Sequence, residues 1–234
     1  MKKSLLKIIL ALILIASCES QAGLAEVYFP LNVGNSWTYT GYEPDWGGGE
    51  PIQKEYTFTI IGKEEIDGFT YYKFNDYFYI FPPPPDGIHR VTTGRETLFR
   101  YDSYADRALM IWSEEEAIRY DFTGNSWDPG PGFGESRLKQ TGITCNIPAG
   151  QFFDCINFQF DWWSNGGPDA YAHGEYLAPN VGNIKFVRPG GSFLGLSEGQ
   201  YVTFELESYT IVPEPATVLI LGVSGMAILR KRKL

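Results

Sequence analysis

The stretch that decides the fold is Tyr56-Thr57-Phe58-Thr59-Ile60, in which apolar and polar residues alternate. Successive side chains of an extended strand point to opposite faces, so this spacing predicts a β-strand with one apolar face. Residues 202–207 repeat the pattern, with Val, Phe and Leu alternating with Thr and Glu. Strands of this kind predict a sheet that turns one face to a core and the other to water.

On both sides of this stretch the same alternation predicts more strands, and Gly and Pro cluster between them at 47–49, 82–85 and 128–132. Asp67-Gly68 predicts a tight hairpin turn. Residues 104–116 could hold a turn or two of helix. We expect an all-β fold, a single antiparallel sheet that is curved or closed over an aromatic core. A β-sandwich, in which two sheets pack face to face, is the related arrangement expected. The further strands are expected near residues 36–42, 69–75, 88–93, 97–102, 116–122, 141–147, 152–162 and 183–188.

The C-terminus combines Pro213-Glu214-Pro215, an apolar run over 216–229, and the basic residues Arg230, Lys231, Arg232 and Lys233. As a helix the run would reach only about 21 Å, against roughly 30 Å of hydrocarbon. Basic residues remain on the cytoplasmic side during insertion, so this tail predicts a transmembrane helix. The prolines hold the preceding peptide extended, outside that helix.

This order of parts resembles the PEP-CTERM sorting signal of bacterial exported proteins. The resemblance covers about the last 22 residues. It implies that an integral-membrane exosortase recognises the signal and cleaves near Pro213-Glu214-Pro215, and that Arg230 to Lys233 act as a membrane stop. The alternative is an ordinary C-terminal anchor, which leaves the paired prolines unexplained.

The N-terminus agrees with export, because Lys2, Lys3 and Lys7 precede a short apolar run, as in a signal peptide. Cleavage has candidate sites after Ala22 and after Ala25, where small residues match signal peptidase. Alternatively, residues 15–18 resemble a lipobox, whose Cys18 would be acylated to give a membrane-anchored lipoprotein.

Three segments are therefore expected: a signal peptide over 1–25, a β-rich extracytoplasmic domain over 26–211, and the sorting signal over 212–234. The expected partners are the Sec translocon, signal peptidase and exosortase, with the inner membrane holding the precursor before delivery to the envelope or extracellular space.

Residues 26–212 contain 12 basic and 26 acidic residues, a net charge of −14. A domain with this negative charge repels nucleic acid, so we expect no nucleic-acid partner.

Loss of Cys18 with the signal peptide would leave Cys145 and Cys155, placed symmetrically about Gly150. A hairpin turning there would bring the two cysteines together, and an oxidising compartment would let them form a disulfide. Simple alternation puts the two sulfurs on opposite faces, so the pairing requires a β-bulge near Cys155-Ile156.

The chain shows no catalytic constellation or metal-ligand spacing, so we expect a non-enzymatic protein without a cofactor. Tyr171, His173 and Glu175 share one strand face and are candidates for ligand binding, although such a row is usually a solvated sheet face. Trp163 is a second candidate, since an exposed ring could stack on a sugar; its alternative role is packing.

Two hypotheses follow: a structural or surface protein of the envelope or matrix, and a carbohydrate-binding module that binds extracellular polysaccharide. Short echoes, such as Asn32-Val33-Gly34-Asn35 and Asn180-Val181-Gly182-Asn183, indicate a reused turn leading into a strand. Residues 28–31 with 34–39, 147–152 and 178–182 also resemble a group of uncharacterised β-rich bacterial secreted proteins and lipoproteins, which implies no activity.

Overall fold

The protein's structure is a computed structural model that describes residues 23–43, 50–75, 97–112, 115–125, 136–160, 173–189 and 201–213. Within these ranges it contains one short helix and eleven strands. The elements are α2 (Leu24–Tyr28), β1 (Ser36–Glu43), β2 (Ile52–Ile66), β3 (Phe69–Asn75), β4 (Thr97–Asp102), β5 (Arg107–Trp112), β6 (Glu115–Asp121), β7 (Ser136–Ile147), β8 (Gly150–Phe160), β9 (His173–Ala178), β10 (Gly182–Pro189) and β11 (Tyr201–Thr210).

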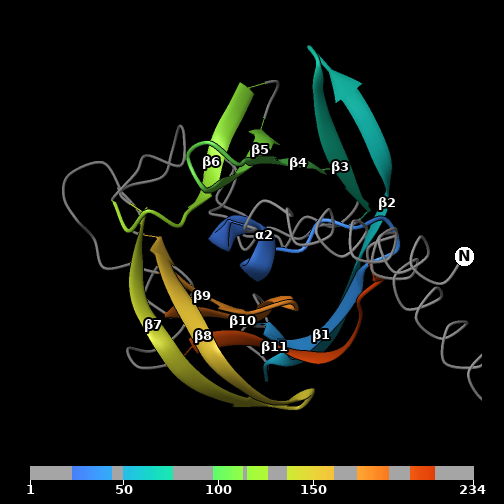
Figure 1. Cartoon of the computed structure of the whole chain (residues 1–234). Coiled ribbons are helices and arrows are strands. Elements are labelled where there is room, and N and C mark those ends of the chain that lie inside the picture. Colours follow the sequence, from blue (N-terminus) through green and yellow to red (C-terminus); the bar gives the residue numbers. More distant parts are fainter. Residues whose placement is uncertain are drawn as a thin grey trace, which may run out of the picture.

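All eleven strands belong to one antiparallel sheet, which curves until it nearly closes on itself (Figure 1). The strand order is β6-β5-β4-β3-β2-β1-β11-β10-β9-β8-β7, so the first and last strands pair at the centre and β6 and β7 form the two edges. We call the gap between these edges the seam. The predicted all-β fold with one curved antiparallel sheet is confirmed. A β-sandwich is wrong, because backbone pairing continues from β6 to β7 without dividing the strands into two sheets.

The turns follow the local chemistry of the sequence. Asp67 and Gly68 have φ values of 51° and 80°, and they join β2 to β3 as the predicted hairpin turn. The two Asn/Gly echoes also behave alike, since Gly34 and Gly182 have φ values of 95° and 100° and each lies at the start of a strand. These positions require left-handed backbone angles, which glycine adopts at no steric cost.

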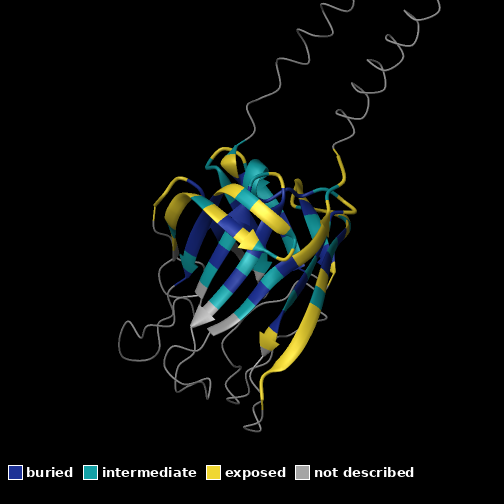
Figure 2. Cartoon of the chain, turned by 90° about the horizontal axis from the view of Figure 1, so that it is seen from below, coloured by how far each residue is buried: buried dark blue, intermediate teal, exposed yellow. Residues whose placement is uncertain are grey.

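An aromatic core fills the inside of the curved sheet. Figure 2 shows buried and intermediate residues alternating along the strands, with exposed residues mainly at strand ends and in loops. Several rings contact one another edge to face, for example Phe74 with Phe99 and Phe122 with Phe158. The largest fully buried side chains are Tyr39, Tyr120, Phe58, Phe74, Phe99, Phe158, Phe160, Phe186, Phe204 and Leu31.

The segment that contains α2 covers one end of the sheet, which we call the α2 end (Figure 1). Behind the helix, Phe29 inserts its ring among Phe74, Phe99 and Tyr120. Backbone groups of the segment are also bonded to strands, because the hydroxyl of Tyr101 donates to the carbonyl of Phe29 at 2.6 Å. A five-residue helix has little stability of its own, so these tertiary contacts hold it in place.

Most of the predicted strands are present, including those near residues 36–42, 69–75 and 97–102. The helical turn expected within 104–116 is wrong: after a turn at 103–106, the chain forms β5 and begins β6. The strand expected near 88–93 lies outside the described residues.

Candidate functional site

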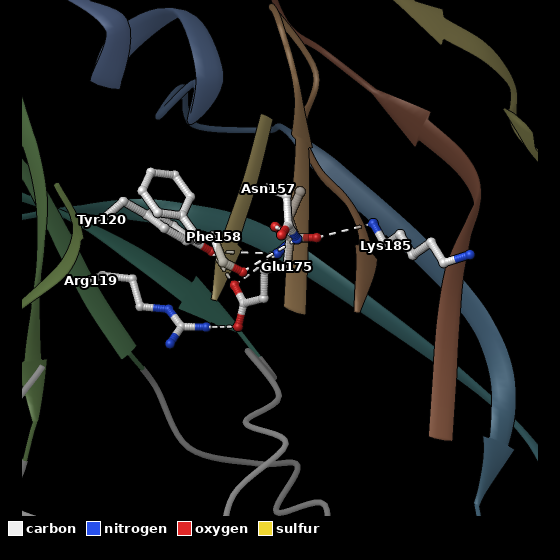
Figure 3. A network of polar contacts seen from close by, with 7 residues as sticks. Arg119, Tyr120, Asn157, Phe158, Glu175 and Lys185 are labelled. Atoms are coloured by element: carbon white, nitrogen blue, oxygen red, sulfur yellow. Dashed lines mark hydrogen bonds and ion pairs between the residues drawn. The ribbon is translucent and has the colours of Figure 1, made fainter. Parts of the chain in front are cut away.

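A cluster of polar side chains lies inside the sheet, centred on Glu175 of β9, which is 1% exposed. Arg119 of β6 forms an ion pair with its carboxylate. The hydroxyl of Tyr120 donates to the second carboxylate oxygen at 2.5 Å, and Asn183 Nδ2 donates to the same oxygen at 3.0 Å. Figure 3 shows Arg119 and Tyr120 reaching from β6 towards Glu175. The carboxylate thus receives donors from two other strands.

A β-bulge in β6 explains why two consecutive residues reach the same carboxylate. Ala108 pairs with Tyr120 and Leu109 pairs with Ile118, so Arg119 is an extra residue between two ladder positions. A bulge interrupts the alternation of side chains. Arg119 and Tyr120 are both buried as a result.

A second bulge occurs in β10, where Asn183 pairs with Leu177 and Lys185 pairs with Tyr176, leaving Ile184 unmatched. Asn183 and Ile184 are both buried. The Asn183 side chain is fixed on both sides, because its Oδ1 accepts from the backbone amide of Lys185 at 3.1 Å while its Nδ2 donates to Glu175. The bulge therefore positions an amide donor for the carboxylate.

Aromatic rings pack against the guanidinium of the ion pair, and both of its side chains are buried. The Arg119 guanidinium lies 4.6 Å from the centroid of the Phe160 ring, close enough for a cation–π interaction. Tyr120 packs against Phe158 of β8, with ring centroids 5.0 Å apart. Side chains of the edge strand β6 thus contact β8 and β9, on the other side of the seam.

The chemistry available to this cluster is limited by its enclosure. A carboxylate in an apolar surrounding is costly unless it is paired and hydrogen-bonded, and Glu175 meets both conditions through Arg119, Tyr120 and Asn183. A general acid or base must reach its substrate, whereas Glu175 is enclosed within the fold. The arrangement is suited to joining strands across the seam.

Of the candidate ligand-binding residues, Glu175 is part of this internal cluster. A solvated face is therefore wrong for Glu175, because β9 turns this side chain and Leu177 into the core. His173 begins β9, and the structure describes its backbone pairing with Phe160. Tyr171 and Trp163 lie outside the described residues, so their predicted roles stay predictions.

Cys145 and Cys155 lie on the paired strands β7 and β8 and are both buried free thiols. The predicted hairpin is present, with β7 ending at Ile147 and β8 beginning at Gly150. The ladder pairs Cys145 with Phe152 and Ile143 with Cys155, so β8 carries an extra residue just before Cys155, and Asp154 there has a φ of 54°. A bulge thus occurs beside the predicted position.

The two thiols affect each other's ionisation. Burial raises the pKa of Cys155 to about 12, and the neighbouring Cys145 thiol adds to the rise. Burial also raises the pKa of Cys145, opposed in part by its hydrogen bond with Cys155. Since the thiolate is the reactive form, both cysteines of the folded, reduced protein are poor nucleophiles near neutral pH.

Of the sorting motif, Pro213 is described and exposed, while Glu214 and Pro215 lie outside the described residues, as do Cys18 and the basic residues 230–233. Among the described parts of the chain, no helix is long and apolar enough to cross a membrane. The predicted signal peptide, lipidation site and terminal helix remain predictions.

The alternation rule does not identify Arg119, Tyr120 and Asn183 as one cluster, because two bulges place them there. One signal was present in the sequence: the repeated Asn-Val-Gly-Asn turn, whose final residues are Asn35 and Asn183. Both are buried asparagines that bond to distant backbone or side-chain atoms. A buried amide after a left-handed glycine is the feature that the two turns share.

No protein-family model and no curated protein matches the chain. Two solved structures are similar to it at 13% sequence identity. One is a provisionally assigned exported protein with a YmcC-like fold from Bacteroides fragilis, with a TM-score of 0.45 over 79% of this chain and 99% of that chain. The other is a provisionally assigned lipoprotein from Parabacteroides distasonis, with a TM-score of 0.38 over 82% of this chain and 100% of that chain.

Proposed function

We propose that this chain is an exported bacterial protein of the cell envelope or extracellular matrix, sorted through its C-terminal PEP-CTERM-like signal and serving a structural, non-enzymatic role. The observation that carries the proposal is the tail, in which Pro213-Glu214-Pro215 precedes an apolar run and four basic residues. An exosortase would act on this tail after the chain has crossed the membrane through the Sec translocon.

The geometry of the last described residues supports the proposal. β11 ends at Thr210, and the backbone amide of Val212 donates to Asn35 Oδ1 at 2.8 Å. The next residue, Pro213, is exposed. The folded domain therefore holds the chain up to the residue before the motif and leaves Pro213, the first residue of the motif, exposed to a processing enzyme.

A structural role agrees with the interior. One buried acid, Glu175, is engaged by Arg119, Tyr120 and Asn183, and its contacts stabilise the sheet. Another buried acid, Asp121, is paired with Arg107. Residues 26–212 contain an excess of acidic residues, and such a net charge favours the solubility of an exported domain.

The sorting signal is tested by replacing Pro213, Glu214 and Pro215 together with alanine in the native host. This change keeps the apolar run and basic residues, so it separates recognition of the motif from simple membrane insertion. We expect the variant to accumulate in the inner membrane, about 2 kDa heavier than the processed form, the mass of roughly 20 residues that insertion alone would not remove. Fractionation and intact-protein mass spectrometry measure both properties.

Val212→Ala is the matched control, since it changes the exposed residue directly before the motif. We expect this variant to be processed like the wild type. A mature surface protein that keeps Leu234 would contradict the sorting signal and indicate an ordinary membrane anchor.

We further propose that Cys145 and Cys155 form a disulfide during export. They lie on adjacent strands, each affects the ionisation of the other, and an exported chain meets an oxidising compartment. Their burial and raised pKa values make oxidation slow once the hairpin has packed, so the bond should form earlier, by exchange with an oxidised thiol–disulfide oxidoreductase.

For the exported full-length protein, we expect no free thiol after denaturation without reductant, and one free thiol in Cys155→Ser. The chain-entropy model gives about 2–3 kcal/mol of stabilisation for a loop of this size. Two titratable thiols in the wild type would overturn the disulfide.

The reduced protein should lose stability as the pH rises above 9.0. In the unfolded chain the thiols ionise there, whereas in the folded protein the pKa of Cys155 is about 12 and the thiol stays protonated.

A further inference from the structure

We infer that signal peptidase cuts between Ala22 and Gly23, and that the new amino group of Gly23 pairs with the carboxylate of Asp106. This inference rests on the proposed export and adds the position of the mature N-terminus and its partner. The sequence leaves cuts after Ala22 and after Ala25 open, because both positions follow small residues. The folded domain distinguishes between them.

The domain needs the residues that a cut after Ala25 would remove. Ala25 is 2% exposed, and its backbone amide donates to Asp106 Oδ1 at 2.8 Å. The amides of Glu26 and Val27 both donate to the carbonyl of Gly23, at 3.1 and 3.2 Å. A chain that began at Glu26 would lose the first turn of α2, a buried methyl group and the contact with Asp106.

The rest of the α2 segment is held in place from other strands. The amide of Asn180, in the turn between β9 and β10, donates to the carbonyl of Val27 at 2.6 Å. The hydroxyl of Tyr28 donates to the carbonyl of Asp154 at 2.7 Å. The helix is thus an integral part of the α2 end, and the mature chain has to begin before it.

Gly23 packs directly against the Asp106 carboxylate. A Cβ atom built on Gly23 would lie 2.7 Å from Asp106 Oδ1, which is closer than real contacts allow. The amino group released by a cut after Ala22 is attached to this same Cα. It would therefore carry a positive charge next to a carboxylate, which also offsets its repulsion from the positive end of the helix.

Asp106 belongs to the turn between β4 and β5, where its φ of 50° is left-handed. The carbonyl of the same residue accepts from the amide of Phe122, directly after β6. Pairing with the new N-terminus would connect α2 to the end of the sheet that includes the edge strand β6. Signal-peptide removal would then complete the fold.

The position of the cut is tested on the full chain expressed in its native host, by N-terminal sequencing of the mature protein. We expect Gly23 as the first residue. A mature protein that begins at Glu26, or at an acylated Cys18, would overturn this inference while leaving the sorting proposal intact. A precursor that keeps both termini would overturn export, and this inference with it.

Ala22→Leu gives a second test, because signal peptidase requires a small residue directly before the cut. We expect this variant to accumulate uncut precursor, whereas the neighbouring control Gln21→Leu should still yield Gly23. Normal maturation of Ala22→Leu would contradict the inference.

The proposed pair between the Gly23 amino group and the Asp106 carboxylate is tested separately, by the unfolding temperature. Asp106→Asn keeps an oxygen that can accept from Ala25 but removes the negative charge, so we expect the mature protein to unfold about 2–4 °C lower, with the difference shrinking at high salt. Asp102→Asn, at the end of β4 directly before the same turn, is the matched control and should change the unfolding temperature less. Equal shifts for both variants would contradict the pairing.

Discussion

Replacing Glu175 with alanine is expected to lower the free energy of unfolding by about 3–5 kcal/mol. The change leaves the buried guanidinium of Arg119 without its carboxylate partner and removes the acceptor of Tyr120 and Asn183. Uncompensated charge inside a protein costs far more than the net gain from forming a buried pair. Urea unfolding followed by circular dichroism measures the loss.

Glu205→Ala is the matched control for this prediction. Glu205 also pairs with a basic residue, since Lys185 Nζ lies 2.6 Å from its Oε1, but both side chains are more than a quarter exposed. Water and salt weaken such pairs, so we expect a loss of only about 0.2–1 kcal/mol. Equal losses for Glu205→Ala and Glu175→Ala would contradict the role given to the buried pair.

The double variant Arg119→Met with Glu175→Leu separates charge from packing. It removes both charges and leaves apolar side chains, a change that is often close to neutral for buried pairs. We expect it to recover the part of the loss that comes from the unpaired charge of Arg119, whereas Tyr120 and Asn183 still lack their acceptor. Hydrogen exchange should show whether the amides of β6 open more easily in the single variant, as a strand held across the seam by side chains would.

The strands could be predicted where side chains alternate without interruption. Residues 56–60 are an example, since Phe58 and Ile60 are buried and Tyr56 is packed beside the core. The turn at Asp67-Gly68 was equally predictable, because its left-handed angles depend on those two residues alone. Patterns that involve only neighbours in sequence are sufficient for such elements.

The candidate site was only partly predictable, because its geometry depends on bulges. Glu175 was singled out from its strand face, but nothing local indicates whether that face is turned to water or to the core. Arg119 and Tyr120 are consecutive, and alternation would send them to opposite faces. Only the register with β5 shows that Arg119 is an extra residue.

In the segments 24–28 and 104–116, the local sequence does not predict the secondary structure. The first was divided between signal peptide and domain, yet it forms α2 because Asp106, Asn180 and Tyr101 hold its segment from other parts of the chain. The second is predicted to contain helical turns, yet pairing with β4 and between β5 and β6 makes residues 107–112 and 115–116 extended. Tertiary contacts override weak local preference in both.

Phe158→Ala is the second variant with a large expected effect, a loss of about 3–5 kcal/mol in the free energy of unfolding. Phe158 on β8 is fully buried, and its ring contacts those of Tyr120 and Phe122 on the far side of the seam. Truncation removes buried apolar surface and leaves a cavity that the surrounding sheet cannot fill completely. Chemical unfolding of the purified protein measures the change.

Phe153→Ala distinguishes this effect from a general loss of aromatic surface, because Phe153 lies on the same strand but is 60% exposed. We expect a change within about 0.5 kcal/mol, as for most surface substitutions. Within the described residues no backbone pairing joins β6 to β7, so side chains have to supply the closure that backbone hydrogen bonds supply elsewhere. A loss near that of Phe153→Ala would mean that Phe158 contributes little to this closure, and would leave it to the buried ion pair and the contacts of Arg119 and Tyr120 with Phe160.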